Sequence, residues 1–201
     1  DVVRNRGVGV LRWSEAARAL QQRIQFLRAV DESWPDWPDE ALQETVDEWL
    51  LPMLGGVRSL QEIDVQQALE AQLPWTQRGK LDELAPTHLE VPTGSMIRID
   101  YSDVNAPAVA VRLQEVFGMT ETPRIGGGRV PITMHLLSPA QRPVQVTRDL
   151  ASFWRSGYFE VKKELKGRYP KHYWPDDPLV AEPVRGVRPG RPGEVLVVRP
   201  D

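Results

Sequence analysis

Hydrophobic residues in the first part of the chain recur at steps of three and four, the spacing of one face of an α-helix. The clearest run follows Ser14, whose side-chain oxygen can accept a hydrogen bond from a first-turn amide. We therefore predict an amphipathic helix after Ser14, ended by the two Trp-Pro pairs at residues 34–38, because proline disrupts helices. Its apolar face consists of Ala16, Ala17, Leu20, Ile24, Leu27 and Val30.

The helical spacing continues to about residue 85. A second helix is predicted from Pro38 or Asp39, ending at Pro52 and Gly55-Gly56, with one apolar stripe of Leu42, Val46, Trp49 and Leu50. Shorter helices are predicted around residues 59–63, 64–73 and 74–84. Tryptophan buries a large apolar area, so the five tryptophans of this part are predicted to serve as core and staple residues. They are Trp13, Trp34, Trp37, Trp49 and Trp75.

From Pro86 onward the pattern changes to the alternation of half-buried strands. Residues 88–91 and 96–101 alternate, and Pro92-Thr93-Gly94-Ser95 between them predicts the turn of a hairpin. Further strands are predicted at 108–112, 130–137 and 144–147, with a short helix at 113–117 and a flexible turn at Gly126-Gly127-Gly128. Asp149 can cap one last long helix. The apolar residues assigned to that helix are Leu150, Phe153, Trp154, Phe159, Val161 and Leu165.

These elements predict an α+β fold. Residues 1–85 form a helical subdomain, and residues 86–178 form a small, mostly antiparallel sheet with packed helices. Residues 179–201 form a tail rich in Pro and Gly, of which residues 182–201 are predicted to be mostly loose, although residues 195–198 could pair as an edge strand.

Charge separates the two halves of the chain. Residues 1–90 carry 9 Lys and Arg against 16 Asp and Glu, whereas residues 91–201 carry 16 against 12. Cysteine is absent, which excludes disulfides and thiol catalysis and fits a cytoplasmic protein. No apolar run reaches the roughly 18 residues of a membrane span, so we expect no membrane partner. The first residues lack both a secretory-signal layout and an initiating methionine, so we expect the chain to be cut from a longer one.

Three long, irregular motifs carry family information: APTHLEVPTGS at residues 85–95, the set VPI, HLLSPAQRP, TRDL and FW within 130–154, and KGRYPKHYWPDDP at 166–178. With residues 11–14 and 49–57, they resemble the C-terminal region of HrpB-type ATP-dependent RNA helicases, in the DEAH/RHA group of superfamily 2. The resemblance extends from about residue 7 to residue 178. It implies a parent protein that unwinds or remodels RNA, with ATP and Mg²⁺ held by its motor domains.

The motor itself is missing from this sequence. It contains neither the G-x-x-x-x-G-K-[ST] phosphate loop nor a DEAH motif. Asp82-Glu83-Leu84-Ala85 lacks the final histidine, and the glycines at 126–128 lack the lysine of a phosphate cradle. We therefore predict a non-catalytic accessory module without a cofactor of its own, whose first partner is the parent's motor.

The stretch from Arg142 to Trp174 is the best candidate for nucleic-acid contact. Through Lys171 it carries eight Lys and Arg against three acids, with aromatic rings interspersed. Basic side chains can neutralise phosphates, and rings can stack on unpaired bases of single-stranded RNA. An equal alternative is that this stretch docks onto the motor of the parent protein. A further alternative is that the stretch is only a solvated helix face, with ion pairs inside the helix and rings that face the core. The predicted strand-contact residues are Arg142, Arg148, Arg155, Lys162, Lys163, Arg168 and Lys171.

Residues 168–178 combine three prolines with four ring side chains and predict a stiff, extended strip. The strip could cover a hydrophobic patch of its own domain, or could dock a partner through Tyr169, His172, Tyr173 and Trp174. Asp176 or Asp177 is expected to cap a helix or to pair with Arg168. The three histidines lack the spacing of metal ligands, so no metal site is predicted. The alternative function is a protein-interaction module that makes no contact with nucleic acid.

Overall fold

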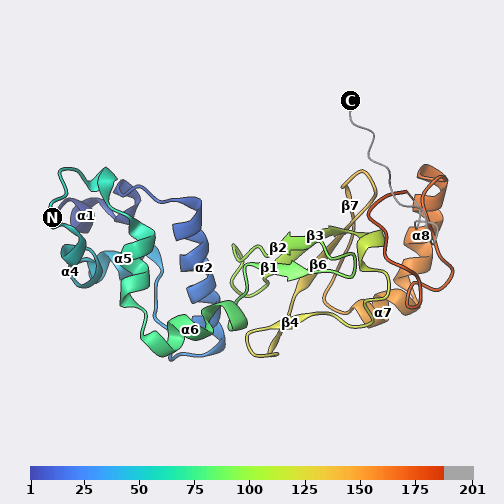
Figure 1. Ribbon diagram of the computed structural model, residues 1–201, viewed down its shortest axis with the longest axis horizontal. Helices are drawn as coiled ribbons and strands as arrows, with labels where there is room; N and C mark the ends of the chain where they lie inside the picture. Colours follow the sequence, from blue (N-terminus) through green and yellow to red (C-terminus); the bar gives the residue numbers. More distant parts are fainter. Residues whose placement is uncertain (188–201) are drawn as a thin grey trace. The chain divides into compact units, whose positions relative to one another are not determined.

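The computed structural model describes residues 1–187 and divides the chain into two compact units. Unit 1 comprises residues 1–87, 99–108 and 124–132, and unit 2 comprises residues 88–98, 109–123 and the chain from residue 133 onward. Helices come first, followed by small antiparallel sheets and C-terminal helices (Figure 1), which confirms the predicted α+β class. The edge strand predicted at 195–198 lies outside the described residues. Within the described part, no helix has the length and apolar character needed to cross a membrane.

Unit 1 begins with a series of short helices around one longer helix. The predicted helix after Ser14 is α2 (Glu15–Val30), and the Ser14 hydroxyl accepts a hydrogen bond from the amide of Ala17 at 3.0 Å. The second predicted helix is interrupted at Thr45, whose hydroxyl donates to the Ala41 carbonyl at 2.8 Å and competes with regular helix geometry. The remaining helices are α1 (Val2–Arg6), η1 (Val8–Val10), α3 (Asp39–Glu44), α4 (Val46–Trp49), η2 (Leu51–Met53), η3 (Leu60–Glu62), α5 (Val65–Gln72) and α6 (Trp75–Leu84).

The tryptophans of unit 1 only partly follow the prediction. Three of the five are buried: Trp34, Trp37 and Trp49. Trp13 is half-buried, and the core assignment is wrong for Trp75, which is 85% exposed. Helix α6 buries Leu81, six residues later and therefore about 120° around the helix from Trp75. The first residue of α6 thus faces away from the side that packs.

A glycine turn closes the last segment of unit 1. Strands β4 (Arg124–Ile125) and β5 (Val130–Pro131) pair antiparallel on either side of Gly126-Gly127-Gly128. All three glycines have positive φ, a conformation that other residues rarely adopt, so the predicted turn is confirmed. The single strand predicted at 130–137 is wrong, because it is divided into β5 and β6 (Thr133–Leu137). Pro131 has no amide hydrogen with which to continue a strand ladder.

Unit 2 is built on small sheets. Strands β1 (His88–Glu90) and β2 (Met96–Arg98) form the predicted hairpin, with Glu90 opposite Met96. A second sheet has the order β3-β6-β7, in which β3 spans Ala108–Arg112 and β7 spans Pro143–Thr147. The short helix predicted after β3 is η4 (Leu113–Val116).

The long helix predicted after Asp149 is two helices, α7 (Leu150–Arg155) and α8 (Gly157–Arg168). Asp149 caps α7 as predicted, accepting from the amide of Ser152 at 2.9 Å. The chain leaves helical geometry at Ser156, where ψ is −65° and φ is −134°. At the junction the Phe153 ring packs so closely that a Cβ on Gly157 would lie 2.9 Å from it. Ring packing therefore selects glycine here and divides the helix.

Candidate nucleic-acid interface

Two rings of the stretch from Arg142 to Trp174, Trp154 and Tyr158, belong to the core of unit 2. Trp154 is 2% exposed and Tyr158 is fully buried, and both pack around Phe117, with ring centroids 6.2 and 6.1 Å from it. The Tyr158 hydroxyl donates to the Pro175 carbonyl at 2.7 Å, and the Trp154 indole donates to a carbonyl as well. Burial raises the pKa of Tyr158 well above its ordinary value, so the phenol stays a donor. These two rings are not available to stack on bases.

The Pro-rich strip packs onto the same core. The Tyr173 ring meets Phe117 edge to face at 6.1 Å, and the Trp174 indole donates to the Tyr169 carbonyl at 2.9 Å. The Pro178 carbonyl accepts from the Gly118 amide at 2.8 Å. Tyr169, His172, Tyr173 and Trp174 are all half-buried. This arrangement favours the interpretation in which the strip covers a hydrophobic patch of its own unit.

Asp176, one of the two acids of the strip, has another partner than expected. Asp176 was predicted to cap a helix or pair with Arg168, but it pairs with Lys162, with Nζ and Oδ1 2.5 Å apart. The reason is that the strip passes beside the first turn of α8, where the Tyr158 hydroxyl binds Pro175. The hydrogen bond from Lys162 lowers the pKa of Asp176. Lys162 is held against the protein, with only 15% of its side chain exposed.

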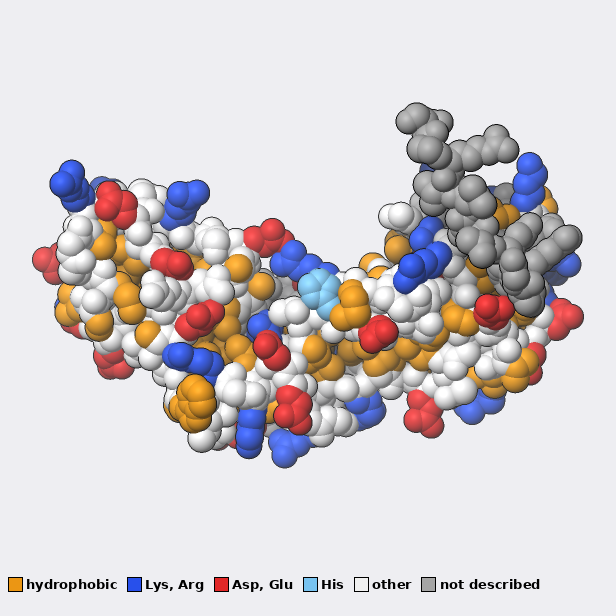
Figure 2. All heavy atoms as spheres, viewed as in Figure 1, with side chains coloured by type: hydrophobic (Ala, Val, Ile, Leu, Met, Phe, Trp, Pro, Cys, Tyr) orange, Lys and Arg blue, Asp and Glu red, His pale blue; other side chains and the backbone are white. Residues whose placement is uncertain are grey.

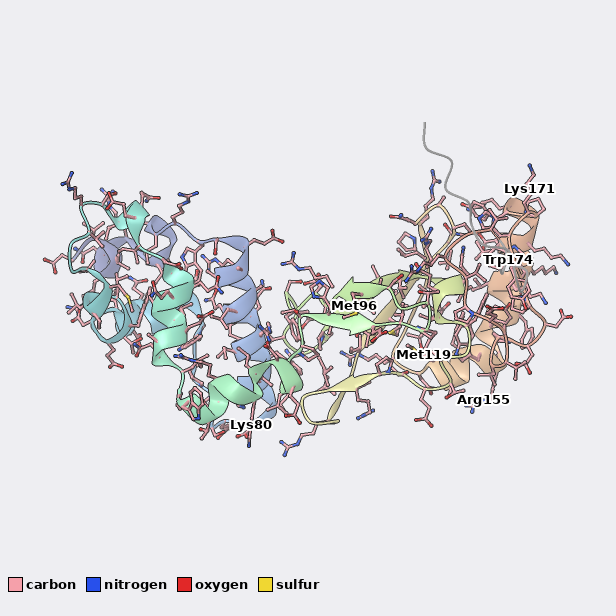
Figure 3. All side chains as sticks on the ribbon, in the orientation of Figure 1. Lys80, Met96, Met119, Arg155, Lys171 and Trp174 are labelled. Carbon is pink, nitrogen blue, oxygen red and sulfur yellow. The ribbon has the colours of Figure 1, made fainter. Side chains whose placement is uncertain are left out.

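The seven predicted strand-contact residues are spread over unit 2. Arg142 lies in the β6–β7 turn, and Arg148 follows β7 and donates to the Thr133 hydroxyl at 2.9 Å. Arg155 and Lys171 lie at opposite ends of α8 (Figure 3). A helix of 12 residues is about 18 Å long, so these two cations are far apart. The predicted residues therefore do not form a single cluster.

One face of α8 is exposed and cationic. Its buried side consists of Tyr158, Val161 and Leu165. On the other side Phe159 is 48% exposed, and Lys163 and Lys166 are exposed one and two turns further along. Among the described residues, neither lysine has an ion-pair partner, whereas Arg168 lies 3.6 Å from Glu164. Lys163 was among the predicted contact residues. Phe159 and Lys166 were counted in the stretch but not selected as contact residues, although their spacing of four and three residues around Lys163 is visible in the sequence.

A second polar group in unit 2 was also missed, centred on the buried carboxylate of Glu115. This side chain is 5% exposed, and its Oε1 accepts from the hydroxyls of Thr93 at 3.0 Å and Ser95 at 2.8 Å. Its Oε2 accepts from Nε of Arg112 at 3.3 Å. The Thr93 carbonyl accepts from Arg185 at 2.7 Å. An acid within the apolar run at 113–117 gives no sequence sign of this role, which is to anchor the β1–β2 turn.

The described residues contain no group of three or more His, Asp or Glu side chains placed to hold a metal ion. His135 is half-buried on β6 and His88 is exposed on β1.

Comparison with known proteins identifies the family. A family described as the C-terminal domain of HrpB-type ATP-dependent helicases matches residues 49–178. The chain belongs to this family. It is 48% identical over 190 residues to the ATP-dependent RNA helicase HrpB of Escherichia coli (strain K12), a match that covers 91% of the chain and 23% of the relative.

Two solved structures of HrpB agree with this family assignment. The crystal structure of the E. coli DExH-box NTPase HrpB superposes with a TM-score of 0.84 and 47% identity, over 90% of the chain and 23% of the other. That of the E. coli DEAH/RHA helicase HrpB gives 0.71 and 45%, over 86% and 22%. The chain therefore spans about a quarter of the length of its relatives. The predicted DEAH/RHA resemblance is confirmed.

Proposed function

We propose that the chain is a non-catalytic C-terminal module of an ATP-dependent RNA helicase, which braces the motor domains and contacts single-stranded RNA. The observation that carries this proposal is the match to 23% of an E. coli protein named as such a helicase. The sequence contains no phosphate loop and no DEAH motif, so ATP and Mg²⁺ would bind elsewhere in the parent. A protein acting on bacterial RNA works in the cytoplasm, which is where we place it.

Exposed cations of unit 2 support the contact with RNA. Arg142, Arg155 and Lys163 are exposed at three different places in unit 2, so a bound RNA strand could contact cations over some distance. Unit 1 is a poorer candidate, because residues 1–90 carry seven more acids than bases. On the face of unit 1 that Figure 2 displays, acidic and basic side chains are interspersed rather than gathered by sign. A polyanion is therefore expected to prefer unit 2.

The test is a titration of the 201-residue chain with a fluorescent single-stranded RNA at about 50 and 200 mM salt, together with an ATPase assay. Neutralising phosphates releases counterions, so binding should weaken steeply at the higher salt. No ATP turnover above a buffer blank is expected. Turnover by the purified chain would contradict the non-catalytic assignment, and absence of binding at the lower salt would contradict RNA contact.

A protein-interaction module is the second candidate. It is favoured by two large apolar side chains that face solvent, Trp75 at 85% and Val180 at 82% exposure. Aromatic residues of this kind are enriched at interface centres. A chain that ignores RNA at about 50 mM salt, and whose capture of a specific protein is lost in Trp75→Ala, would support this candidate over the first.

A further inference from the structure

The solvent face of α8 carries one ring and two cations in a line. Counting 100° per residue, Lys163 lies about 40° to one side of Phe159 and Lys166 about 20° to the other. With a rise of 1.5 Å per residue, the three side chains are spread over about 10.5 Å of the helix axis. We call Phe159, Lys163 and Lys166 the α8 stripe. The two acids of the helix that face solvent, Glu160 and Glu164, lie about 100° and 140° from Phe159, on the side of Lys163, and the charge of Lys166 acts on the carboxylate of Asp176.

We propose that the α8 stripe is a binding site for single-stranded RNA, in which Phe159 stacks on an unpaired base and the two lysines bind neighbouring phosphates. This inference rests on the proposed function and names the site that carries it. It also reduces the number of cations involved. Lys162 and Arg168, on the same helix, are engaged with Asp176 and Glu164 and are left out of the site.

The ring of Phe159 is placed to stack. Its inner neighbour is Tyr158, whose ring meets it nearly edge on at 5.5 Å, so Phe159 is supported from one side while 48% of it stays exposed. Every base has a π face, so stacking on such a ring is tolerant of sequence. An acidic peptide would satisfy the lysines, but it offers a flat partner only where it carries an aromatic residue, whereas a nucleic-acid strand carries a base beside every phosphate. The combination therefore favours a nucleic-acid strand.

The experiment measures the binding of two RNA oligonucleotides of 20 nucleotides, oligo(U) and an abasic strand of the same length. Binding is followed by fluorescence anisotropy over a series of salt concentrations. Lys163→Gln with Lys166→Gln removes two phosphate contacts. For single strands each contact contributes about 0.7 to the slope of log K against log salt, so the slope should become shallower by about 1.4. Phe159→Ala should weaken oligo(U) binding about fivefold or more, leave the slope unchanged, and leave the abasic strand unaffected.

Matched controls lie in unit 1. Arg12→Gln with Lys80→Gln removes the same charge from exposed positions, and Figure 3 shows Lys80 on α6. Trp75→Ala removes an aromatic ring that is more exposed than Phe159. Both controls should bind oligo(U) as the wild type does. Lys163→Arg with Lys166→Arg should keep the wild-type slope, because the charge is retained.

The possible results distinguish a failure of the α8 stripe as the binding site from a failure of the proposed RNA contact itself. Salt-sensitive binding by the wild type that is unaltered in the Gln and Phe159→Ala variants would overturn the α8 stripe but leave the proposed function intact. Equal weakening by the unit 1 controls would also overturn it, since contact would then be diffuse. A wild-type chain that binds neither strand would refute the proposed RNA contact itself, and the stripe with it.

Discussion

Replacing the buried carboxylate of Glu115 by an amide should destabilise unit 2 by about 1.5 kcal/mol. Glutamine keeps the volume and one carbonyl oxygen, which can still accept from Thr93 and Ser95. It places an NH₂ group where Oε2 accepted from Nε of Arg112, so two donors face each other. A hydrogen bond to a charged group contributes about 1.5–3 kcal/mol. The lower value applies because 31% of the Arg112 side chain is exposed and water can replace the lost partner.

Glu115→Ala should cost more, about 3 kcal/mol, because the two hydroxyls then lose their acceptor as well. The matched control is Glu90→Gln, which removes the same charge from an exposed position on the β1–β2 hairpin. That change should cost less than about 0.5 kcal/mol, as surface substitutions usually do.

The assay combines urea unfolding with amide hydrogen exchange in the hairpin turn. The Gly94 amide donates to the Val91 carbonyl at 2.7 Å, and the Val91 amide donates to the Ser95 carbonyl at 3.0 Å. Both amides should exchange about tenfold faster in Glu115→Gln, since 1.4 kcal/mol of local stability is a factor of ten. The reasoning is refuted if this variant unfolds within 0.5 kcal/mol of the wild type and its Gly94 amide exchanges at the wild-type rate.

Two further predictions concern α8. Gly157→Ala should lower the free energy of unfolding by about 1–3 kcal/mol, because the new Cβ would overlap the Phe153 ring. Gly167→Ala meets open space and should raise the free energy of unfolding by about 0.5 kcal/mol in the same urea titration. Equal changes in the two variants would contradict the packing argument. The pKa of Asp176 is lowered by Lys162, so the pair stabilises the fold above the ordinary carboxyl value of 3.8 and loses this effect as pH falls through the lower folded value. The Tm difference between wild type and Asp176→Asn should therefore be present at pH 7 and shrink as the pH falls below 3.8, and a difference that stays constant down to pH 2 would contradict the pairing.

Elements specified by a few neighbouring residues could be predicted from the sequence. The Ser14 cap of α2, the hairpin turn at residues 92–95 and the glycine turn at 126–128 each depend on side chains or φ angles within a single turn. Features that depend on distant partners were missed or wrong. The division between α7 and α8 needs the packing of Phe153 at Gly157, and the exposure of Trp75 depends on which side of α6 finds a partner.

In the candidate site, the sequence also fails to predict which cations are held in ion pairs by distant residues. Lys162 and Lys163 are adjacent and chemically identical, and the sequence gives no reason to separate them. Asp176, fourteen residues further on, binds the first and leaves the second in solvent. Composition therefore predicts how many cations a surface carries, while the path of a distant segment decides which of them can meet a phosphate.

Helical spacing, which can be read from the sequence, decides which of the two adjacent rings Tyr158 and Phe159 is buried. Phe159 was named among the apolar residues of the last helix and Tyr158 was not, yet Tyr158 is buried and Phe159 faces solvent. Spacing explains the choice: residues 158, 161 and 165 differ by three and four and share one face, whereas 159 lies about 100° away. The Tyr158 hydroxyl still finds an acceptor at Pro175, so its burial leaves no unsatisfied donor. The register of the core therefore forces Phe159 outward, where its ring is exposed on the same face as Lys163 and Lys166.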